Sequence, residues 1–521
     1  MLRTQVLIIG GGATGTGLAR DLALRGIQCV LVEKGDINAG ASGANHGYLH
    51  SGARYVYKDI ETSKECYRES LILKKMAPHC IEETGGFFVA VEGDDEGYAA
   101  DFPNLCSQCG IPVQAVDIAQ ARELEPALSD KSIAVFATPE AAINPFRLSC
   151  ENMTQAMALG AICLRWTKVV GFTQHRGKIR STTLMNVKTG QELTVEADQV
   201  VSASGAWAGE VSALLGIPIH IVFSKGTLII TEHRIAQRVI MRLRPPSDAD
   251  ALIPGGSVSI LGTSSIRVES PDDAFPTVEE VDHIMDEGAR MIPLLEQTRV
   301  IRAYAGIRPL IRTKLNRDDR DLSRDFVLFD HSQDGVDNFI SITGGKLTTY
   351  RLMAERAADL VCTRLGISTP CLTQDQPLPS TSDCHWTEPA LAPKLWAIKH
   401  DPADYFLCEC EMVPASAVDN LLKSIQATHD NADLSAIANR SRVGRGPCQG
   451  TFCGIRVTAH LYNQGMLKSD EGLKDLKNFL EQRWKGHHPV LWDVQLQQGE
   501  LEEALHAGLF GLELLDDPAQ S

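Results

Sequence analysis

The chain has 521 residues, of which 44% are hydrophobic and 22% are charged. These values are ordinary for a globular protein of two to four domains with a sizeable core. The formal net charge of −16 disfavours nucleic-acid binding, which rewards a basic surface, but a few arginines and lysines can still form a local positive pocket for a small anion.

The sequence contains no apolar run close to the roughly 20 residues needed to cross a bilayer. Residues Met1–Gln5 lead directly into an expected strand, so no signal peptide is visible. We therefore expect a cytoplasmic protein that reaches a membrane only peripherally, through partners. In that reducing compartment the 14 cysteines are not expected to form disulfides.

The first 35 residues predict a strand, a glycine-rich turn, a helix and a second strand. Gln5–Ile9 is an apolar run, and Ala13–Arg25 has the apolar spacing of a helix. Gly26 ends that helix, and Cys29–Val32 is the next apolar run. This order is the opening of a dinucleotide-binding α/β unit.

The turn itself contains the motif G-x-G-x-x-G in this strand–turn–helix context. Gly10 permits the tight turn, Gly12 lets backbone approach a pyrophosphate, and Gly15 allows close packing of helix on strand. Glu33, at the end of the second strand, can accept from a ribose hydroxyl. A glycine-rich turn without ligand is the alternative. The motif does not choose between NAD and FAD, but its place at the N-terminus favours FAD.

Two later segments have a similar character. Val200–Gly205 ends an expected strand in a turn of small residues, and Phe339–Ile342 precedes Thr343–Lys346 and a helix from about Leu347 to Leu365. All three segments fit one FAD wrapped by three parts of the chain. We expect further FAD contacts at Gly205, Gly344, Gly345, Lys346 and Leu347.

The predicted organisation is a Rossmann-like FAD-binding α/β domain with an interleaved α+β substrate domain and a small C-terminal domain. FAD-binding segments are expected at about 1–75, 151–215 and 301–370, and substrate-domain segments at about 76–150 and 216–300. A proline-rich linker is expected at 371–404. It is followed by a compact module at 405–460 and a helical tail at 461–521.

A long segment then points to a family. Ala39–Tyr55 reads AGASGANHGYLHSGARY, and it is joined by RAYAGIRP at 302–309, TGGKLTTYR at 343–351 and EQRWKG at 481–486. These segments resemble the FAD-dependent glycerol-3-phosphate dehydrogenases, nearest the anaerobic A type, and the resemblance covers essentially the whole chain. Ala206–Gly209 is a small departure from the family pattern.

The resemblance implies a D-amino-acid-oxidase-like fold and the oxidation of sn-glycerol 3-phosphate to dihydroxyacetone phosphate by hydride transfer to FAD. It places Arg54, Tyr55, Arg308 and Lys346 around the substrate. A guanidinium fork, an ammonium and a phenol hydroxyl suit a phosphate. Ser42 and Asn45 are expected to contact FAD near its pyrophosphate.

The base that takes the hydroxyl proton is expected to be His50, because imidazole titrates near neutral pH. His46 is the rival, and either histidine can instead serve only as a donor to flavin or backbone. Arg308 can polarise the developing alkoxide. Lys225 is either a substrate contact or a surface charge at a strand end, and we favour the second.

Four cysteines form two close pairs, Cys408 with Cys410 and Cys448 with Cys453. Such a set of soft thiolates suits a [2Fe–2S] cluster or zinc. Residues 442–450 resemble the bacterioferritin-associated-ferredoxin-like domain, which implies [2Fe–2S]; zinc and a metal-free thiol set stay as alternatives. The other pair, Cys106 and Cys109, is expected to be core packing.

In the anaerobic members of this family, the flavin-containing catalytic chain works with two partner subunits. One is a second flavin-containing chain, called B, and the other, called C, is a membrane-associated iron–sulfur protein that passes electrons to quinone during anaerobic respiration. The resemblance thus implies a cytoplasmic protein, peripheral at the inner membrane through these partners. Two alternatives remain: a related flavoenzyme acting on another hydroxy or amino acid, which would bind a carboxylate, and a non-catalytic electron carrier, which needs no substrate clamp.

Overall fold

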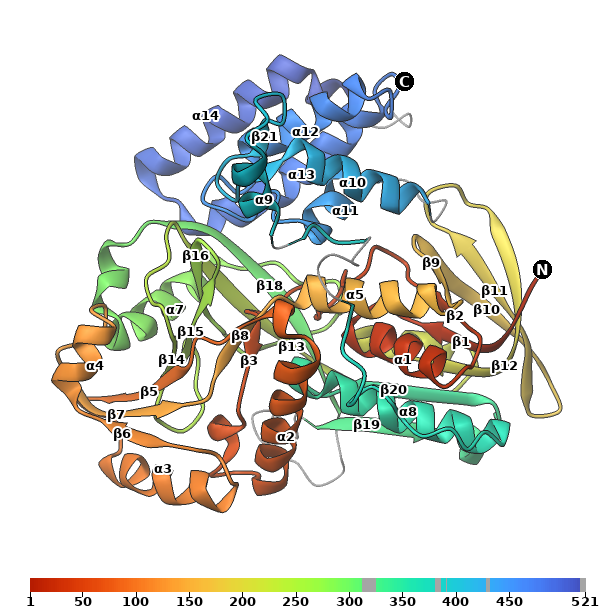
Figure 1. Cartoon of the computed structure of the whole chain (residues 1–521), viewed down its shortest axis with the longest axis horizontal. Coiled ribbons are helices and arrows are strands. Elements are labelled where there is room, and N and C mark those ends of the chain that lie inside the picture. Colours follow the sequence, from red (N-terminus) through yellow and green to blue (C-terminus); the bar gives the residue numbers. More distant parts are fainter. Residues whose placement is uncertain (312–324, 380–385, 390, 428–431, 516–521) are drawn as a thin grey trace.

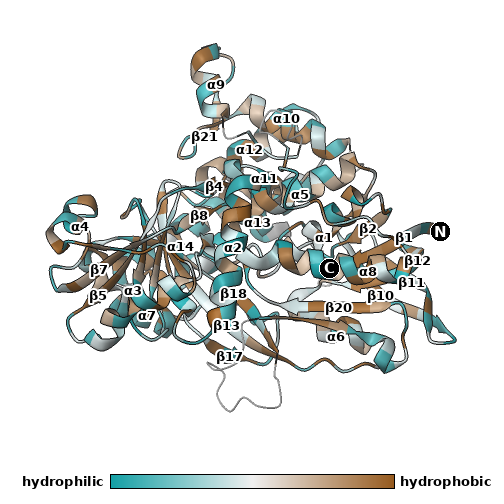
Figure 2. Cartoon of the chain, turned by 60° about the horizontal axis from the view of Figure 1, so that its bottom comes forward, coloured by the Kyte–Doolittle hydropathy of each residue, from teal (hydrophilic) through white to brown (hydrophobic). Residues whose placement is uncertain are grey.

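The computed structural model describes residues 1–311, 325–379, 386–389, 391–427 and 432–515. Two large β-sheets lie next to each other, and a mostly helical C-terminal part covers one side of both (Figure 1). Several central strands of both sheets are predominantly hydrophobic in Figure 2, for example β5 Gly86–Val91, β7 Ser132–Thr138 and β20 Phe339–Gly344. The predicted architecture, an α/β part with a parallel strand core and a second, mixed α+β part, is confirmed.

The first sheet has eight strands, in the order β10-β11-β12-β1-β2-β9, with β20 joined to β12 and β19 to β20. Its strands are β1 Leu2–Ile9, β2 Cys29–Val32, β9 Ile162–Leu164, β10 Thr167–His175, β11 Lys178–Asn186, β12 Glu192–Ser202, β19 Phe326–Asp330 and β20 Phe339–Gly344.

The helices of this first part are α1 Ala13–Leu24, α5 Pro145–Ala158, α6 Ala208–Ala213 and α8 Tyr350–Leu365. α1 packs against α5 and α8. β1 runs parallel to β2 and β12, and β12 runs parallel to β20, so the ends of these strands meet at one edge. The predicted first strand–helix–strand unit is confirmed, because the bounds of α1 and β2 lie within about two residues of those expected. β1 ends at Ile9 as expected but begins earlier, at Leu2.

The second sheet has nine strands, in the order β17-β13-β16-β15-β14-β5-β7-β6, with β18 joined to β13. Its strands are β5 Gly86–Val91, β6 Gln114–Val116, β7 Ser132–Thr138, β13 Ile221–Thr231, β14 Val239–Arg242, β15 Ala251–Gly255, β16 Val258–Gly262, β17 Ile266–Val268 and β18 Val300–Ile311. Around it lie α2 Ile60–Met76, α3 Glu96–Gln108, α4 Ile118–Leu124 and α7 Val278–Met291, with a small sheet of β3 Tyr48–Leu49, β4 Ile81–Glu82 and β8 Ala141–Ile143.

Strand β18 pairs with β13 along almost the whole of both strands. Residues 300–311 therefore belong to the second sheet, although the sequence predicts an FAD-binding segment from 301. The pairing explains the difference, because β18 is largely buried in the second sheet while its far end reaches toward the first. Residues 312–324 of that predicted segment lie outside the described residues.

The C-terminal part contains α9 Ala392–Lys399, β21 Phe406–Cys408, β22 Val413–Pro414, α10 Ala415–Gln426, α11 Leu434–Arg440, α12 Thr451–Asn463, α13 Glu471–His487 and α14 Asp493–Phe510. Val418 of α10, Val457 of α12 and Phe479 of α13 share one core. Most of the predicted tail is thus packed into the same unit as residues 405–460. Residues 380–385 and 390 of the predicted linker, and 516–521 of the tail, lie outside the described residues.

Every described helix is either too short or too polar to cross a bilayer.

A buried cluster of charges ties the C-terminal part to the first sheet. Arg440 of α11 binds the Asp36 carboxylate through two nitrogens, at 2.6 and 2.9 Å, and Arg165 binds it at 2.9 Å. Burial alone would raise the pKa of Asp36, but the two guanidiniums hold that pKa below its usual range. Arg440 also stacks on the Trp386 ring, 4.4 Å from its centre. The contact is therefore a fully desolvated ion pair rather than a surface bridge.

We expect Arg440→Met to destabilise the protein by about 3–5 kcal/mol, because it leaves the buried carboxylate with one partner in place of two. Arg456→Met is the matched control, since Arg456 pairs with Glu409 on the surface, with both side chains more than 40% exposed. Chemical denaturation compares the variants. Equal midpoints for both would show that the Asp36 cluster does not hold the parts together.

Candidate functional site

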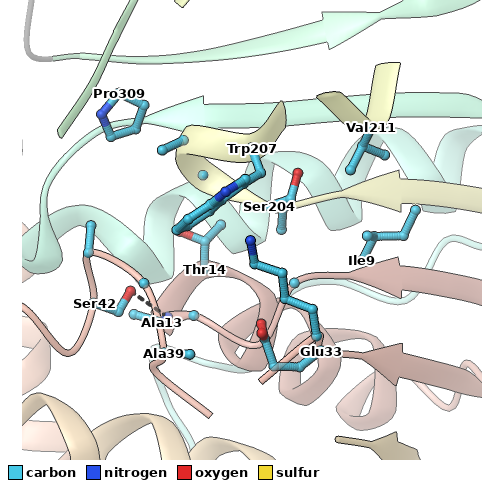
Figure 3. Close-up of a pocket in the computed structure, with 18 of the residues that line it drawn as sticks. Ile9, Ala13, Thr14, Glu33, Ala39, Ser42, Ser204, Trp207, Val211 and Pro309 are labelled. Atoms are coloured by element: carbon cyan, nitrogen blue, oxygen red, sulfur yellow. Dashed lines mark hydrogen bonds between the residues drawn. The ribbon is translucent and has the colours of Figure 1, made fainter. Parts of the chain in front are cut away.

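A cavity of about 920 Å³ lies at the ends of β1, β2 and β12 and extends to β18 and the start of α8. Figure 3 shows residues of several of these segments pointing into it. The predicted cofactor residues on its lining are Gly10, Gly12, Glu33, Ser42, Asn45, Gly205, Gly344, Gly345, Lys346 and Leu347. The ends of parallel strands are where open α/β sheets bind ligands. The structure thus brings together segments that are far apart in sequence.

The glycine-rich turn has little room for side chains. Gly10 has a φ of +113°, and a Cβ there would lie 2.5 Å from the Ala203 carbonyl oxygen. A Cβ on Gly15 would lie 1.9 Å from the Gly10 oxygen. Gly15 therefore serves helix–strand packing and does not line the cavity.

The N-terminus of α1 faces the cavity beside Gly12. Ser42 Oγ accepts a hydrogen bond from the Ala13 N–H at 2.9 Å (Figure 3), and a Cβ on Gly12 would lie 3.0 Å from that oxygen. Exposed backbone N–H groups and the helix dipole make such an end favourable for a phosphate. The geometry fits a pyrophosphate held between the turn and Ser42.

Glu33 lies at the rim of the same cavity, with its side chain drawn in Figure 3. Its carboxylate accepts from the backbone N–H of Gly11 at 2.6 Å and of Gly35 at 2.8 Å. Burial raises the pKa of Glu33, and these two bonds oppose the rise. The carboxylate is thus fixed in orientation and keeps acceptor capacity for a hydroxyl.

The two distant turns are joined directly. Thr343 Oγ1 donates to the Gly205 carbonyl oxygen at 2.8 Å, which connects the end of β20 to the end of β12. Gly205, Gly344 and Gly345 have φ values of +56°, +85° and +73°, which favour glycine. Backbone from both turns therefore lines the cavity closely.

Asn45 supports the loop that closes this cavity. Its Nδ2 donates to the Ser42 carbonyl oxygen at 2.7 Å, and its Oδ1 accepts from the Gly47 N–H at 2.8 Å. The side chain of Asn45 thus shapes the loop, and the carbonyl of Asn45 accepts from Tyr304 at 2.9 Å.

Two predicted substrate cations, Arg308 and Lys346, line the cavity. Arg308 extends from β18 and donates to the Ser264 carbonyl oxygen at 3.2 Å. Lys346 Nζ lies 3.3 Å from an Asp325 oxygen and 5.1 Å from the centre of the Tyr55 ring. The structure therefore brings a guanidinium, an ammonium and a tyrosine into one region.

Arg54 lies elsewhere. Its Nη2 binds the Asp250 carboxylate at 2.8 Å, and Arg244 binds the other oxygen of that carboxylate at 2.9 Å. Among the described residues, neither Arg54 nor Tyr55 lines the cavity itself, although Tyr55 lies next to its Lys346. The role of Arg54 at the substrate stays a prediction.

Neither candidate base lines the first cavity. His50 is 7% exposed, and its ring lies edge-on to Tyr55, with ring centres 5.3 Å apart. His46 lines a second cavity rather than the first. This arrangement favours His50 over His46 as the histidine near the substrate cations.

Trp207 is a cavity residue that sequence reasoning missed. Its ring lies in the cavity in Figure 3, the Lys34 ammonium sits 3.8 Å from the ring centre, and its indole N–H donates to Asp272 at 3.2 Å. The available signal was a bulky aromatic side chain two residues after Gly205. The family resemblance made this segment look like a minor departure, so it received no role.

The interpretation of Lys225 as a surface charge is wrong. Lys225 is 6% exposed, and its Nζ lies 2.8 Å from Glu280 and 2.7 Å from the carbonyl oxygen of Phe275. β13 is an interior strand of its sheet, and a lysine buried there needs a carboxylate partner. Lys225 thus serves an internal ion pair.

The four paired cysteines come together beside α12. Cys408 and Cys453 are buried, Cys448 is partly exposed and Cys410 is exposed. Thiol hydrogen bonds join Cys453 to Cys408 and Cys448, and join Cys448 to Cys410. The bond from Cys453 is the main cause that lowers the pKa of Cys448 to about 5. The pKa of Cys408 is also lowered, whereas those of Cys410 and Cys453 are raised, so two of the four sulfurs favour the thiolate, which is the form that binds metals.

Backbone N–H groups also point at these sulfurs. Gly444 and Glu411 donate to Cys408, and Gly450 and Phe452 donate to Cys448. Hydrogen bonds to sulfur are a recurring feature of iron–sulfur sites. The donor set and its surroundings fit a thiolate-bound metal centre.

The other cysteine pair behaves as expected. Cys106 and Cys109 are buried in the core that also holds Phe88 and Phe102, so the prediction of core packing is confirmed.

Comparisons with known proteins agree with this geometry. The family model for FAD dependent oxidoreductases matches residues 5–359. The chain is 40% identical to the A subunit of the anaerobic glycerol-3-phosphate dehydrogenase of Escherichia coli K12, over 98% of this chain and 97% of that protein. It is 38% identical to the corresponding protein of Haemophilus influenzae, over 100% and 96%.

Among solved structures, the FAD complex of the Bacillus halodurans glycerol-3-phosphate dehydrogenase superposes with a TM-score of 0.69, at 20% identity, over 94% of this chain and 96% of that one. Glycine oxidase of Geobacillus kaustophilus gives 0.58 at 21% identity, over 73% and 99%. These two show the shared fold. From the family model and the near full-length relatives, the chain belongs to the FAD-dependent oxidoreductase family, in the branch that contains the A subunits of anaerobic glycerol-3-phosphate dehydrogenase.

Proposed function

We propose that the chain oxidises sn-glycerol 3-phosphate to dihydroxyacetone phosphate with FAD as the hydride acceptor, and that the electrons leave through a [2Fe–2S] centre toward a quinone via partner subunits. The observation that carries the proposal is the pair of cations, Arg308 and Lys346, in the same cavity as the dinucleotide turn. The near full-length relatives, whose names describe them as parts of a glycerol-3-phosphate dehydrogenase, support it.

The cavity residues suit FAD. Gly12, the N-terminus of α1 and Ser42 would hold the pyrophosphate, and Glu33 would accept from a ribose hydroxyl. When bound, FAD would supply a two-electron hydride acceptor. The glycines at the ends of β12 and β20 would let backbone approach the rest of the cofactor.

The substrate end suits a dianion. Two cations lie there: Arg308 donates to the neutral Ser264 carbonyl oxygen, and Lys346 pairs with the half-exposed Asp325 carboxylate, which a bound phosphate would displace. A carboxylate substrate carries one charge, whereas a phosphate carries close to two and accepts more hydrogen bonds. The pair therefore favours a phosphorylated alcohol over an amino or hydroxy acid. Tyr55 and Arg54 would complete the clamp.

For the chemistry, we assign His50 as the group that takes the hydroxyl proton and Arg308 as the group that stabilises the developing alkoxide. His50 reaches the substrate end through Tyr55, whose ring lies next to both His50 and Lys346. The contacts that hold the phosphate would also orient the carbinol carbon for reaction, so part of the binding energy would lower the activation barrier. A pure electron carrier needs neither the cations nor the histidine.

The cysteine set would hold a [2Fe–2S] cluster through Cys408, Cys410, Cys448 and Cys453, supplying a one-electron acceptor. Zinc is the alternative for the same thiolates. The names of the relatives describe them as subunits, which supports partners here: a flavin-containing B chain and a membrane-associated iron–sulfur C chain. The complex would then lie on the cytoplasmic face of the inner membrane.

Gly12→Glu should strip FAD from the protein, because the added carboxylate would occupy the space beside Ser42 and repel the pyrophosphate. The purified variant should be colourless by flavin absorbance, with unchanged circular dichroism. Gln28→Glu, which adds the same charge at an exposed loop before β2, should keep its flavin. A folded Gly12→Glu protein with full flavin would refute the assignment of the turn.

Lys346→Gln and Arg308→Ala should each lower kcat/KM for glycerol 3-phosphate about 10- to 150-fold, since each loses a charge-assisted contact of roughly 1.5–3 kcal/mol. For unphosphorylated glycerol, kcat/KM should fall far less with Lys346→Gln. Lys34→Gln is the control, because Lys34 lines another part of the cavity, beside Trp207. In this variant the ratio of kcat/KM for glycerol 3-phosphate to kcat/KM for glycerol should not change. Equal losses for both substrates with Lys346→Gln would contradict a phosphate clamp.

Cys448→Ser should leave reduction of the flavin by glycerol 3-phosphate almost intact and strongly slow turnover with the partner subunits. The reason is that the cysteine set would act only after substrate oxidation. Rapid-mixing measurement of flavin bleaching, steady-state turnover and iron content separate the steps. Cys109→Ser, in the other pair, should change none of the three. Normal turnover in an iron-free Cys448→Ser protein would exclude the relay, and zinc in the wild type would exclude [2Fe–2S].

A further inference from the structure

A second cavity, of about 560 Å³, lies where the C-terminal part meets the two sheets. Its walls come from the loop at Asn45 and His46, from β16 and β18, and from the segment 438–449 with α13. Six arginines line it: Arg147, Arg302, Arg440, Arg442, Arg445 and Arg483. No role in the proposed function uses this space.

Three of these arginines are neutralised by carboxylates. Arg440 binds Asp36, Arg147 Nε lies 2.6 Å from Glu151, and Arg442 pairs with Glu411. These three are ordinary buried ion pairs.

The other three, Arg302, Arg445 and Arg483, have no carboxylate partner among the described residues. Their hydrogen bonds are long and go to neutral oxygens: Arg302 to the Gln449 side chain at 3.4 Å, Arg445 to a carbonyl at 3.3 Å, and Arg483 to a carbonyl at 3.3 Å. Arg445 and Arg483 also stack on the rings of Phe146 and Phe479, 4.0 and 3.6 Å from the ring centres, which leaves their N–H donors without strong acceptors. The Nε atoms of Arg302 and Arg483 are buried with no hydrogen-bond partner in the described part of the chain. Five-donor guanidiniums are seldom left in this state, because desolvating a charge without a partner is costly.

The arginines of this cavity also repel one another. Burial lowers the pKa of Arg445 to about 10, and the neighbouring Arg442 adds to that effect. Burial likewise lowers the pKa of Arg302 and of Arg483, and Arg302 and Arg445 both repel Arg483. A bound anion would relieve the repulsion and supply the missing acceptors.

The acidic groups on the lining do not balance this charge. Glu82 already pairs with Arg234 at 2.7 Å. Burial raises the pKa of Glu388 to about 7, so near neutral pH that carboxyl carries only part of a charge. The cavity therefore keeps an excess of positive charge.

Apolar and aromatic side chains form part of the remaining walls. Ile230, Val258 and Ile260 line one part, and Tyr304 and Phe146 line another. The volume is within the range of small-molecule sites, and the mixture of apolar wall with a few convergent charges is typical of them.

We infer that this second cavity binds a phosphate-bearing organic anion, held by Arg302, Arg445 and Arg483 at its charged end and by the apolar walls along its body. Guanidinium forks match phosphate oxygens in pairs, and three cations suit a ligand with two or more negative charges. The shared chemistry, a phosphate, can come from a free ion or from an organic phosphate.

Isothermal titration of the FAD-loaded wild type with inorganic pyrophosphate and with AMP tests this inference. Both probes should bind, and AMP should bind at least as tightly because the apolar walls hold its base. Arg302→Met should weaken both probes at least about tenfold, since one charge-assisted contact is lost. Without added anion, the variant should not melt below the wild type, because an unpaired buried charge is replaced by an apolar side chain of similar length.

Two matched variants locate the binding. Arg299→Met removes an exposed arginine three residues earlier, outside the cavity, and should leave binding unchanged. Lys346→Gln removes a phosphate contact of the first cavity, so the binding of both probes that this variant retains belongs to the second cavity and should be weakened by Arg302→Met in the same background. The inference fails if neither probe binds, if Arg302→Met binds both probes like the wild type, or if Lys346→Gln abolishes binding. If pyrophosphate binds and AMP does not, the proposal that the ligand carries an organic group is wrong.

Discussion

The contact between Gly15 and the carbonyl of Gly10 is the constraint on which the rest of this architecture depends. Helix α1 approaches the end of β1 so closely that a single methyl group would overlap backbone. The approach aims the N-terminus of α1 at the cavity and leaves Ser42 as its side-chain partner. The loop from Ser42 onward then carries Asn45 and leads to His50 and Tyr55, so both ends of the first cavity take their position from this one contact.

Strand β18 is the second organising element, because it serves both cavities. Arg308, near its far end, lies in the first cavity, while Arg302 and Tyr304 lie in the second. These residues are spaced by even numbers and share one face of the strand. The same face is thus positively charged at both ends, and the hydroxyl of Tyr304 binds the Asn45 carbonyl between them.

What could be predicted from the sequence is local. The first strand–helix–strand unit, the three turns around the first cavity and the core cysteines Cys106 and Cys109 follow from spacing and residue type over a few positions. Sequence reasoning could not identify partners that are distant in the chain. The ion pair of Arg54 with Asp250 joins residues 196 apart, and the burial of Lys225 depends on Glu280. Neither the periodicity of apolar residues nor a sequence motif identifies which carboxylate pairs with which cation.

The Asp36–Arg440 ion pair has a consequence for how the two halves of the chain work together. Asp36 lies three residues after Glu33 at the rim of the first cavity, and Arg440 lies between the two cysteine pairs in sequence. The anchor therefore fixes the separation of the dinucleotide turn and the cysteine set directly. In a tethered module the effective concentration of one site at the other depends on linker length. Here the buried ion pair, with Trp386 stacked on Arg440, sets the distance that an electron would travel.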